Sequence, residues 1–220
     1  MIQAEHICKY YTNHNHTVRA VDDVSFTVAK HERVGIAGGS GSGKSTLLRL
    51  MAMLEKPTSG TLQLFGEDIS QIQNYTEVYR SLQMMFQNPL AVIPPRMNLE
   101  SFLLEPYINY GLMDMTEAKE DIRKWIRHVD LPETIIQKYP HEVSGGQLQR
   151  VVLARIMLMK PKLVLFDEPT SALDAVNQKL VLDLLQKLHR EQPFGYVFVS
   201  HDIGLLQAVT DRIIVMKDGQ

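Results

Sequence analysis

The run RVGIAGGSGSGKSTLLRLMAM occupies residues 33–53 and decides the fold. Its first five residues, RVGIA, are apolar enough for a short buried strand. The glycines after them form a loop, and a helical pattern then runs to Met53, ahead of Pro57 and Gly60. The run therefore predicts a strand, a loop and a helix in succession, which is the start of an α/β core.

The loop fits the pattern G-x-x-x-x-G-K-[ST] in the strand and helix context that this motif requires. Glycines let backbone N–H groups turn toward an anion, and the helix N-terminus favours negative charge. Lys44 is expected to reach the β and γ phosphates of a nucleotide, and the Ser45 hydroxyl to ligate Mg²⁺. The predicted phosphate loop comprises Gly38, Gly39, Ser40, Gly41, Ser42, Gly43, Lys44, Ser45 and Thr46. Taken alone, it indicates only a nucleoside triphosphatase.

Further apolar segments on both sides of this unit predict an α/β architecture. Residues 3–11 and 18–28 alternate like half-buried strands, and a helical region without a convincing strand lies between Asn88 and Lys160. Further strands are predicted at 61–65, 82–86, 163–166, 196–200 and 212–216, and helices at 117–129, 146–159 and 177–191.

Two acids follow the apolar run Leu163-Val-Leu-Phe166. Asp167 at the strand end is placed to hold Mg²⁺ near the phosphates. Glu168 is a candidate general base if the chain bends there, because adjacent residues of a strand otherwise face opposite ways. His201 follows another apolar strand, where open α/β sheets place ligands, and is a candidate hydrogen-bond donor to the γ-phosphate.

Composition narrows the classes of function. The chain has 220 residues, a formal net charge of −2 and one cysteine, Cys8. The charge gives no basic surplus for nucleic acid, and a single cysteine forms no internal disulfide. With no secretory signal and no run of about 20 apolar residues, we expect a cytoplasmic protein whose membrane role, if any, comes through a partner.

Ser144-Gly145-Gly146-Gln147 precedes a helix and is a second candidate anion site. With Gln87, Asp167-Glu168, Asp174 and His201 in this order, the chain resembles the nucleotide-binding domain of ABC ATPases over essentially its whole length. The resemblance implies a RecA-like P-loop NTPase core with an N-terminal antiparallel β region and an inserted α-helical subdomain. We expect one domain over residues 1–220, with a core lobe at 1–87 and 160–220 and a helical subdomain at 88–159.

The resemblance also implies roles for individual residues. Ser144, Gly145, Gly146 and Gln147 would cap the ATP of a second ATPase subunit, so the active unit would be a head-to-tail dimer. Gln87 would contact Mg²⁺ or the water and report to integral membrane permease subunits, and Asp174 would bridge the dimer. Tyr11 would stack on adenine, with Tyr10 as the alternative. Val143 stands where the family usually has leucine, an exchange of one apolar residue for another.

A narrower resemblance concerns the runs FQNPLAVIPPRMNL and YPHEVSGGQLQR, which look like the peptide and nickel importer branch of this family. It implies an ATP- and Mg²⁺-dependent ATPase at the cytoplasmic face of the membrane, served indirectly by an extracellular substrate-binding protein. Peptide and nickel cargo both stay open, as do homodimer and heterodimer. The branch typically continues beyond the position where this chain stops, which leaves open a truncated chain or a short variant.

Two other functions compete with a transport motor. A soluble ABC ATPase of translation, DNA repair or chromosome organisation usually has two ATPase domains, long coiled coils or zinc-binding cysteine pairs, and this sequence has none of these. A degenerate ATPase that only binds nucleotide is disfavoured because every expected catalytic position is occupied.

Overall fold

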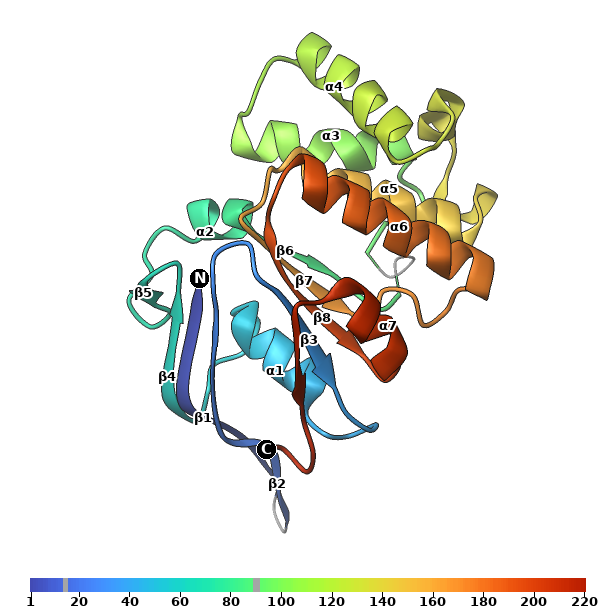
Figure 1. Cartoon of the computed structure of the whole chain (residues 1–220). Helices are drawn as coiled ribbons and strands as arrows, with labels where there is room; N and C mark the ends of the chain where they lie inside the picture. The colour runs from blue at the N-terminus through green and yellow to red at the C-terminus, as the bar shows by residue number, and fades with distance from the viewer. Residues whose placement is uncertain (14–15, 89–91) are drawn as a thin grey trace. The chain divides into compact units, whose positions relative to one another are not determined.

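The computed structural model describes residues 1–13, 16–88 and 92–220. Pro89, Leu90 and Ala91, part of the run FQNPLAVIPPRMNL, therefore lie outside the described residues. The chain divides into two compact units, labelled by element in Figure 1. The first unit comprises Met1–Met84, Lys162–Glu168 and Pro193–Gln220, and the second Met85–Pro161 and Pro169–Gln192. The described residues of the predicted helical subdomain, 88 and 92–159, fall within the second unit. That unit also includes residues 169–192.

A five-stranded sheet of the first unit carries the strands predicted from apolar runs. β3 pairs in parallel with β8 and β9, and β7 pairs in parallel with β8. Every residue of β8 is buried, as expected for a strand covered on both faces. The sheet order is β6 (Leu82–Met85), β7 (Leu163–Asp167), β8 (Gly195–Ser200), β3 (Arg33–Ala37) and β9 (Arg212–Val215).

Two helices of this unit follow strands of the sheet. α1 (Lys44–Met51) begins within the phosphate loop, and α7 (Ile203–Val209) follows β8. The prediction extended the first helix to Met53, but it ends at Met51, and Met53 has a φ of 56°. Because parallel strands share a direction, the loops after β3, β7 and β8 gather at one edge of the sheet.

An antiparallel sheet forms the N-terminal part of the same unit, as predicted. Its order is β2 (His16–Val28), β1 (Ile2–Asn13), β4 (Ser59–Leu64) and β5 (Glu67–Asp68). Buried residues of both sheets and of α1 form one apolar core, which includes Ile7, Ile36 and Leu47. A short helix, α2 (Tyr75–Ser81), which the sequence patterns did not predict, precedes β6.

The second unit is helical in its described part. Each helix begins after a residue whose side-chain oxygen accepts from first-turn N–H groups, namely Asn98, Asp114, Ser144 and Asp174. The helices are α3 (Leu99–Tyr110), α4 (Met115–His128), α5 (Gly145–Leu158) and α6 (Ala175–Glu191). Ten of the fourteen residues of α5 are buried, so this helix is the centre of the unit.

Pro106 lies inside α3, where proline ordinarily interrupts a helix. Having no N–H, it leaves the carbonyl of Phe102 without its usual helical donor. Arg155 of α5 donates Nη1–H to that carbonyl, and its Nη2 lies 2.8 Å from a carboxylate oxygen of Glu105. Its guanidinium also stacks 4.2 Å from the centroid of the Phe102 ring. One partly buried arginine thus satisfies the carbonyl that the proline leaves without a donor.

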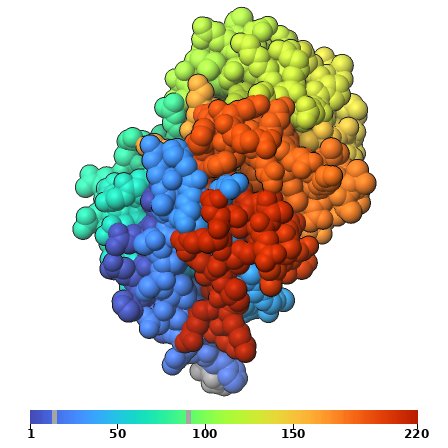
Figure 2. Space-filling view, viewed as in Figure 1, coloured from blue at the N-terminus to red at the C-terminus, as the bar shows by residue number. Residues whose placement is uncertain are grey.

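The C-terminal segment of the first unit lies along β2 on the face seen in Figure 2. The N–H of Asp22 donates to the carbonyl of Gly219 at 2.8 Å, and the N–H of Gly219 donates to the carbonyl of Ser42 at 3.2 Å. This segment therefore supports the phosphate loop through the contact between Gly219 and Ser42. None of the helices in the described residues is long and apolar enough to cross a membrane.

Candidate functional site

The phosphate loop joins β3 to α1 and is held by its glycines. Gly43, the N-cap of α1, has a φ of 101°, and a Cβ there would lie 2.0 Å from the carbonyl oxygen of Ala20. A Cβ at Gly38 would lie 2.4 Å from the carbonyl oxygen of Met216. Gly39 and Gly41 are exposed, and a Cβ at either would meet no atom within 4 Å. The loop is thus packed against the protein on one side and open on the other.

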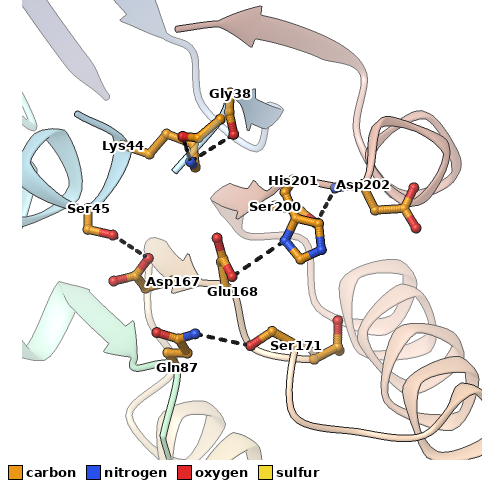
Figure 3. Close-up of polar contacts among 12 residues, drawn as sticks. Gly38, Lys44, Ser45, Gln87, Asp167, Glu168, Ser171, Ser200, His201 and Asp202 are labelled. Carbon is orange, nitrogen blue, oxygen red and sulfur yellow. Dashed lines mark hydrogen bonds and ion pairs between the residues drawn. The ribbon is translucent and has the colours of Figure 1, made fainter. Parts of the chain in front are cut away.

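Unused polar groups of this loop fit an anionic ligand. The N-terminus of α1 has no side-chain cap, so its first N–H groups are available to an acceptor. Among the described residues, the buried Oγ of Ser42 has no hydrogen-bond partner. Lys44, only 6% exposed, donates from Nζ to the carbonyls of Gly38 and Gly39, each at 2.8 Å (Figure 3). The loop therefore holds a cation and free donors at one place, as phosphate binding requires.

Asp167 ends β7 beside the start of α1. The Ser45 hydroxyl donates to Oδ1 of Asp167 at 3.1 Å (Figure 3). Partial burial raises the pKa of Asp167, and the neighbouring charge of Glu168 raises it further, against the opposing hydrogen bond from Ser45. A hydroxyl and a carboxylate oxygen are ligands that Mg²⁺ accepts together with substrate phosphates, so the donor set fits that ion.

Glu168 departs from the geometry of the strand that it follows. Its φ of 44° is left-handed, and its N–H donates to the carbonyl of Val199 on β8 at 3.2 Å. Its Oε2 lies 3.6 Å from Nδ1 of the exposed His201, which follows β8 (Figure 3). The left-handed turn frees Glu168 from the alternation of the strand, which is the bend that its predicted role requires.

The raised pKa of Asp167 predicts that this carboxylate lowers stability. The folded state binds the proton more tightly than the unfolded chain, so stability falls as the pH rises from 3.8 through the folded pKa. We expect Asp167→Asn to raise the melting temperature at pH 7 without metal or nucleotide, by about 2–4 °C for each 1 kcal/mol of relieved burial cost. The gain should vanish below pH 3.8. Thermal melts with a chelator across this pH range measure it.

Asp68 offers a matched control for that experiment. Hydrogen bonds from the Ser70 hydroxyl and N–H lower the pKa of Asp68, so its ionised form is favoured in the folded state. Asp68→Asn should therefore lower the melting temperature at pH 7 or leave it unchanged. An unchanged or lower melting temperature for Asp167→Asn would contradict the cost assigned to its carboxylate.

The two candidate adenine-stacking tyrosines have different neighbours. Tyr11 is 40% exposed, its hydroxyl donates to Glu55 at 2.5 Å, and it also interacts with Thr46 at the end of the phosphate loop. The Tyr10 hydroxyl instead donates to Asp22 on β2, at 2.5 Å. The exposed ring beside the loop is that of Tyr11.

The run Ser144 to Gln147 forms a capping box at the start of α5. The Oγ of Ser144 accepts from the N–H of Gln147, and the Gln147 side chain accepts from the N–H of Ser144. A Cβ on Gly146 would lie 2.6 Å from Oδ1 of Asn177 in α6, so a glycine is needed for close packing. Ser144 and Gly145 are exposed, which leaves this helix end accessible.

Asp174 and Gln87 are also placed by hydrogen bonds within the second unit. Asp174 caps α6 by accepting from the N–H groups of Val176 and Asn177, and the latter's Nδ2 also donates to it at 2.6 Å. Gln87 is exposed, and its Nε2 donates to Ser171 at 3.4 Å (Figure 3).

Sequence patterns did not identify Gln149, a fully buried polar residue of α5. The available signal was an amide in the otherwise largely apolar stretch that follows Gln147. Glu55, the partner of Tyr11, was also missed, since no local pattern links positions 11 and 55.

Comparison with known proteins supplies the family. Residues 21–171 match the family model described as ABC transporter. The chain is 40% identical over 206 residues to the oligopeptide transport ATP-binding protein AppF of Bacillus subtilis. The aligned region covers 92% of this chain and 63% of that protein. It is 38% identical over 205 residues to the di/tripeptide transport ATP-binding protein DppF of Pseudomonas aeruginosa, covering 92% of this chain and 64% of that protein. The chain thus spans somewhat less than two thirds of the length of these relatives.

A solved structure agrees with the sequence comparisons. The dimeric, post-hydrolysis state of an ATP-binding cassette bound to ADP and Pi has a TM-score of 0.89 and 30% sequence identity, covering all of this chain and 95% of that one. The predicted P-loop α/β fold class is thereby confirmed. The family match spans the phosphate loop, the Ser144 to Gln147 run and the Asp167-Glu168 pair, and it confirms the resemblance seen in the sequence: this chain belongs to the ABC transporter family.

Proposed function

We propose that this chain is the ATP-hydrolysing motor subunit of an ABC importer for peptides. The observation that carries the proposal is the contact between Ser45 and Asp167, 3.1 Å apart, because it joins the phosphate loop to the strand end that bears Glu168. A hydroxyl, a carboxylate and a candidate base then occur together beside uncapped N–H groups. These are the groups that phosphoryl transfer uses for positioning and electrostatic stabilisation.

In the proposed mechanism the phosphate loop binds the triphosphate of ATP. The N–H groups of residues 38–46 and the ammonium of Lys44 donate to the phosphate oxygens, and Lys44 exchanges its bonds to Gly38 and Gly39 for them. Ser45 and Asp167, with Gln87, would hold Mg²⁺, which neutralises the charge of the β and γ phosphates. Tyr11 stacks on the adenine.

Glu168 accepts a proton from the attacking water. The water oxygen forms a bond to the γ-phosphorus as the bond to the β–γ bridging oxygen breaks, which yields ADP and phosphate. His201 donates a hydrogen bond to the γ-phosphate. Its Nδ1 lies 3.6 Å from Oε2 of Glu168, so both side chains can contact the same phosphate group and its attacking water. The proton stays on the Glu168 carboxylate until product release.

Turnover in this proposal needs a second ATPase subunit. The exposed N-terminus of α5, with Ser144, Gly145, Gly146 and Gln147, donates to the ATP held by the other subunit, while Asp174 bridges the pair. The dimeric state of the solved ATP-binding cassette supports this arrangement. The second subunit is another copy or a related chain, and both are consistent with the site.

Membrane permease subunits and an extracellular substrate-binding protein complete the proposed importer. The motor then lies peripherally at the cytoplasmic face, and Gln87 reports nucleotide state to the permease. Peptide is the proposed cargo, because the relatives named above transport oligopeptides and di- or tripeptides by their names. Neither of these two relatives is named for nickel.

Uptake by the assembled transporter tests this function. With the full chain assembled with its permease in vesicles and the substrate-binding protein supplied, we expect ATP-dependent uptake of a labelled tripeptide, no uptake of nickel ion, and no uptake by the Lys44→Ala variant. Nickel uptake without peptide uptake would overturn the cargo. Co-purification with ribosomes or DNA instead of membrane proteins would favour the soluble ATPase of translation or DNA repair.

A further inference from the structure

Three glutamine side chains hold the segment that directly follows Glu168. Each donates its amide N–H to a different residue of that segment; Gln149 lies on α5, Gln178 on α6 and Gln87 in the loop after β6. The donors and acceptors are Gln149 to the Pro169 carbonyl, Gln178 to the Thr170 hydroxyl at 3.3 Å, and Gln87 to the Ser171 hydroxyl at 3.4 Å. Pro169 and Thr170 are buried, so their positions are set by protein contacts alone.

Gln149 differs from the other two because it is buried and bonds to the backbone. It is 1% exposed, and it lies on α5 two residues after Gln147. Within the described residues its Oε1 has no hydrogen-bond partner. An apolar side chain here would remove the unpaired oxygen but would leave the buried Pro169 carbonyl without this donor, at a cost of about 1–3 kcal/mol. What glutamine supplies at this position is therefore the hydrogen bond that fixes the Pro169 carbonyl.

The backbone at Glu168 needs such support. A non-glycine residue with φ of 44° is strained, and a residue before proline is normally extended. On its N-terminal side Glu168 is fixed by its N–H bond to Val199. On its C-terminal side the next carbonyl along the chain is the one that Gln149 holds. Without these two restraints, the backbone of Glu168 would relax toward the extended region, and the Glu168 side chain would turn away from the position of the attacking water.

We propose that Gln149 is a positioning residue for the Glu168 carboxylate, acting through the carbonyl of Pro169. This inference rests on the proposed function, in which Glu168 is the general base. It also connects the helix that begins with the Ser144 to Gln147 run to the base of the same chain through one hydrogen bond and one intervening residue, Pro169. A shift at the start of α5 then reaches Glu168 without a change at the phosphate loop.

Steady-state kinetics of Gln149→Met in the assembled ATPase test the proposal. Methionine has a similar length but no donor. We expect kcat for ATP to fall by about 10²-fold, the usual effect of displacing a catalytic group by about 1 Å, with KM and ATP affinity within about twofold. The structural control is Val152→Ala, which removes buried volume one turn further along α5 and should lower the melting temperature while kcat stays within about twofold.

Glu168→Gln separates this inference from the function on which it rests. In that background, Gln149→Met should change the residual rate by less than about twofold, since both changes disable one base. If Glu168→Gln turns over normally, the proposed base and this inference both fall. If Glu168→Gln is slow but Gln149→Met keeps a normal kcat, or only lowers the melting temperature as Val152→Ala does, only this inference falls. If Gln149→Met does not fold, Gln149→Asn replaces it in the test, because the shorter side chain holds the amide one methylene further from the Pro169 carbonyl. This variant should also lower kcat while KM stays within about twofold.

Discussion

Glu168→Gln is expected to slow ATP hydrolysis by about 10²- to 10⁴-fold, the range over which a positioned general base contributes. Glutamine preserves the size of the side chain but does not accept the proton of the attacking water. ATP affinity should stay within about twofold, because Lys44 and the N–H groups of the phosphate loop are unchanged. Phosphate release under single turnover and equilibrium binding of a fluorescent ATP analogue measure the two quantities separately.

Glu5→Gln is the matched control for this result. Glu5 lies exposed on β1, where it accepts a hydrogen bond from Gln3, so the same chemical change should leave both hydrolysis and binding unaltered. Normal turnover by Glu168→Gln in the assembled transporter would remove Glu168 from the role of base. Loss of ATP binding would show that its carboxylate supports the loop instead.

Gly43→Ala is expected to have the largest effect on the phosphate loop. The new Cβ would lie 2.0 Å from the carbonyl oxygen of Ala20, at a φ of 101° that side chains avoid. Because the clash is with backbone, the loop or β2 must move. We expect a loss of unfolding free energy of at least about 2 kcal/mol and ATP binding weaker by about 10- to 100-fold. Urea unfolding and titration with an ATP analogue give the two values.

Gly66→Ala separates the clash from the backbone conformation. Gly66 has a φ of 92° between β4 and β5, and a Cβ there would meet no atom within 4 Å. This control should cost about 1 kcal/mol of stability with ATP affinity unchanged. Equal effects of the two substitutions would mean that contact with Ala20 contributes nothing to the loop.

The strands around the phosphate loop could be predicted because each is a short apolar run that ends in glycine or in acids. Leu163 to Asp167 and Arg33 to Ala37 are such runs, and both match the observed strands closely. Helices α2 and α7, with seven residues each, are too short for periodicity to reveal. The interior proline of α3 also obscures that helix in the sequence, since Pro106 normally signals a helix end.

The sequence predicts which residues make up the candidate site but not their geometry. Residue types and spacing indicated that Lys44, Ser45 and Asp167 work together, because strand ends of a parallel sheet meet at one edge. The left-handed turn at Glu168 depends on contacts with distant residues, among them Val199. No local pattern reveals the pairing of Gln149 with Pro169, which lie 20 residues apart in sequence.

The proline of α3 and the arginine of α5 also limit the order in which this sequence can change. Loss of Arg155 alone would leave the Phe102 carbonyl without a donor, whereas exchanging Pro106 for alanine first would restore an N–H to that carbonyl. Arg155 then becomes replaceable at a smaller cost. The cost of replacing Arg155 thus depends on whether Pro106 is present, and the less costly order of substitution changes Pro106 first.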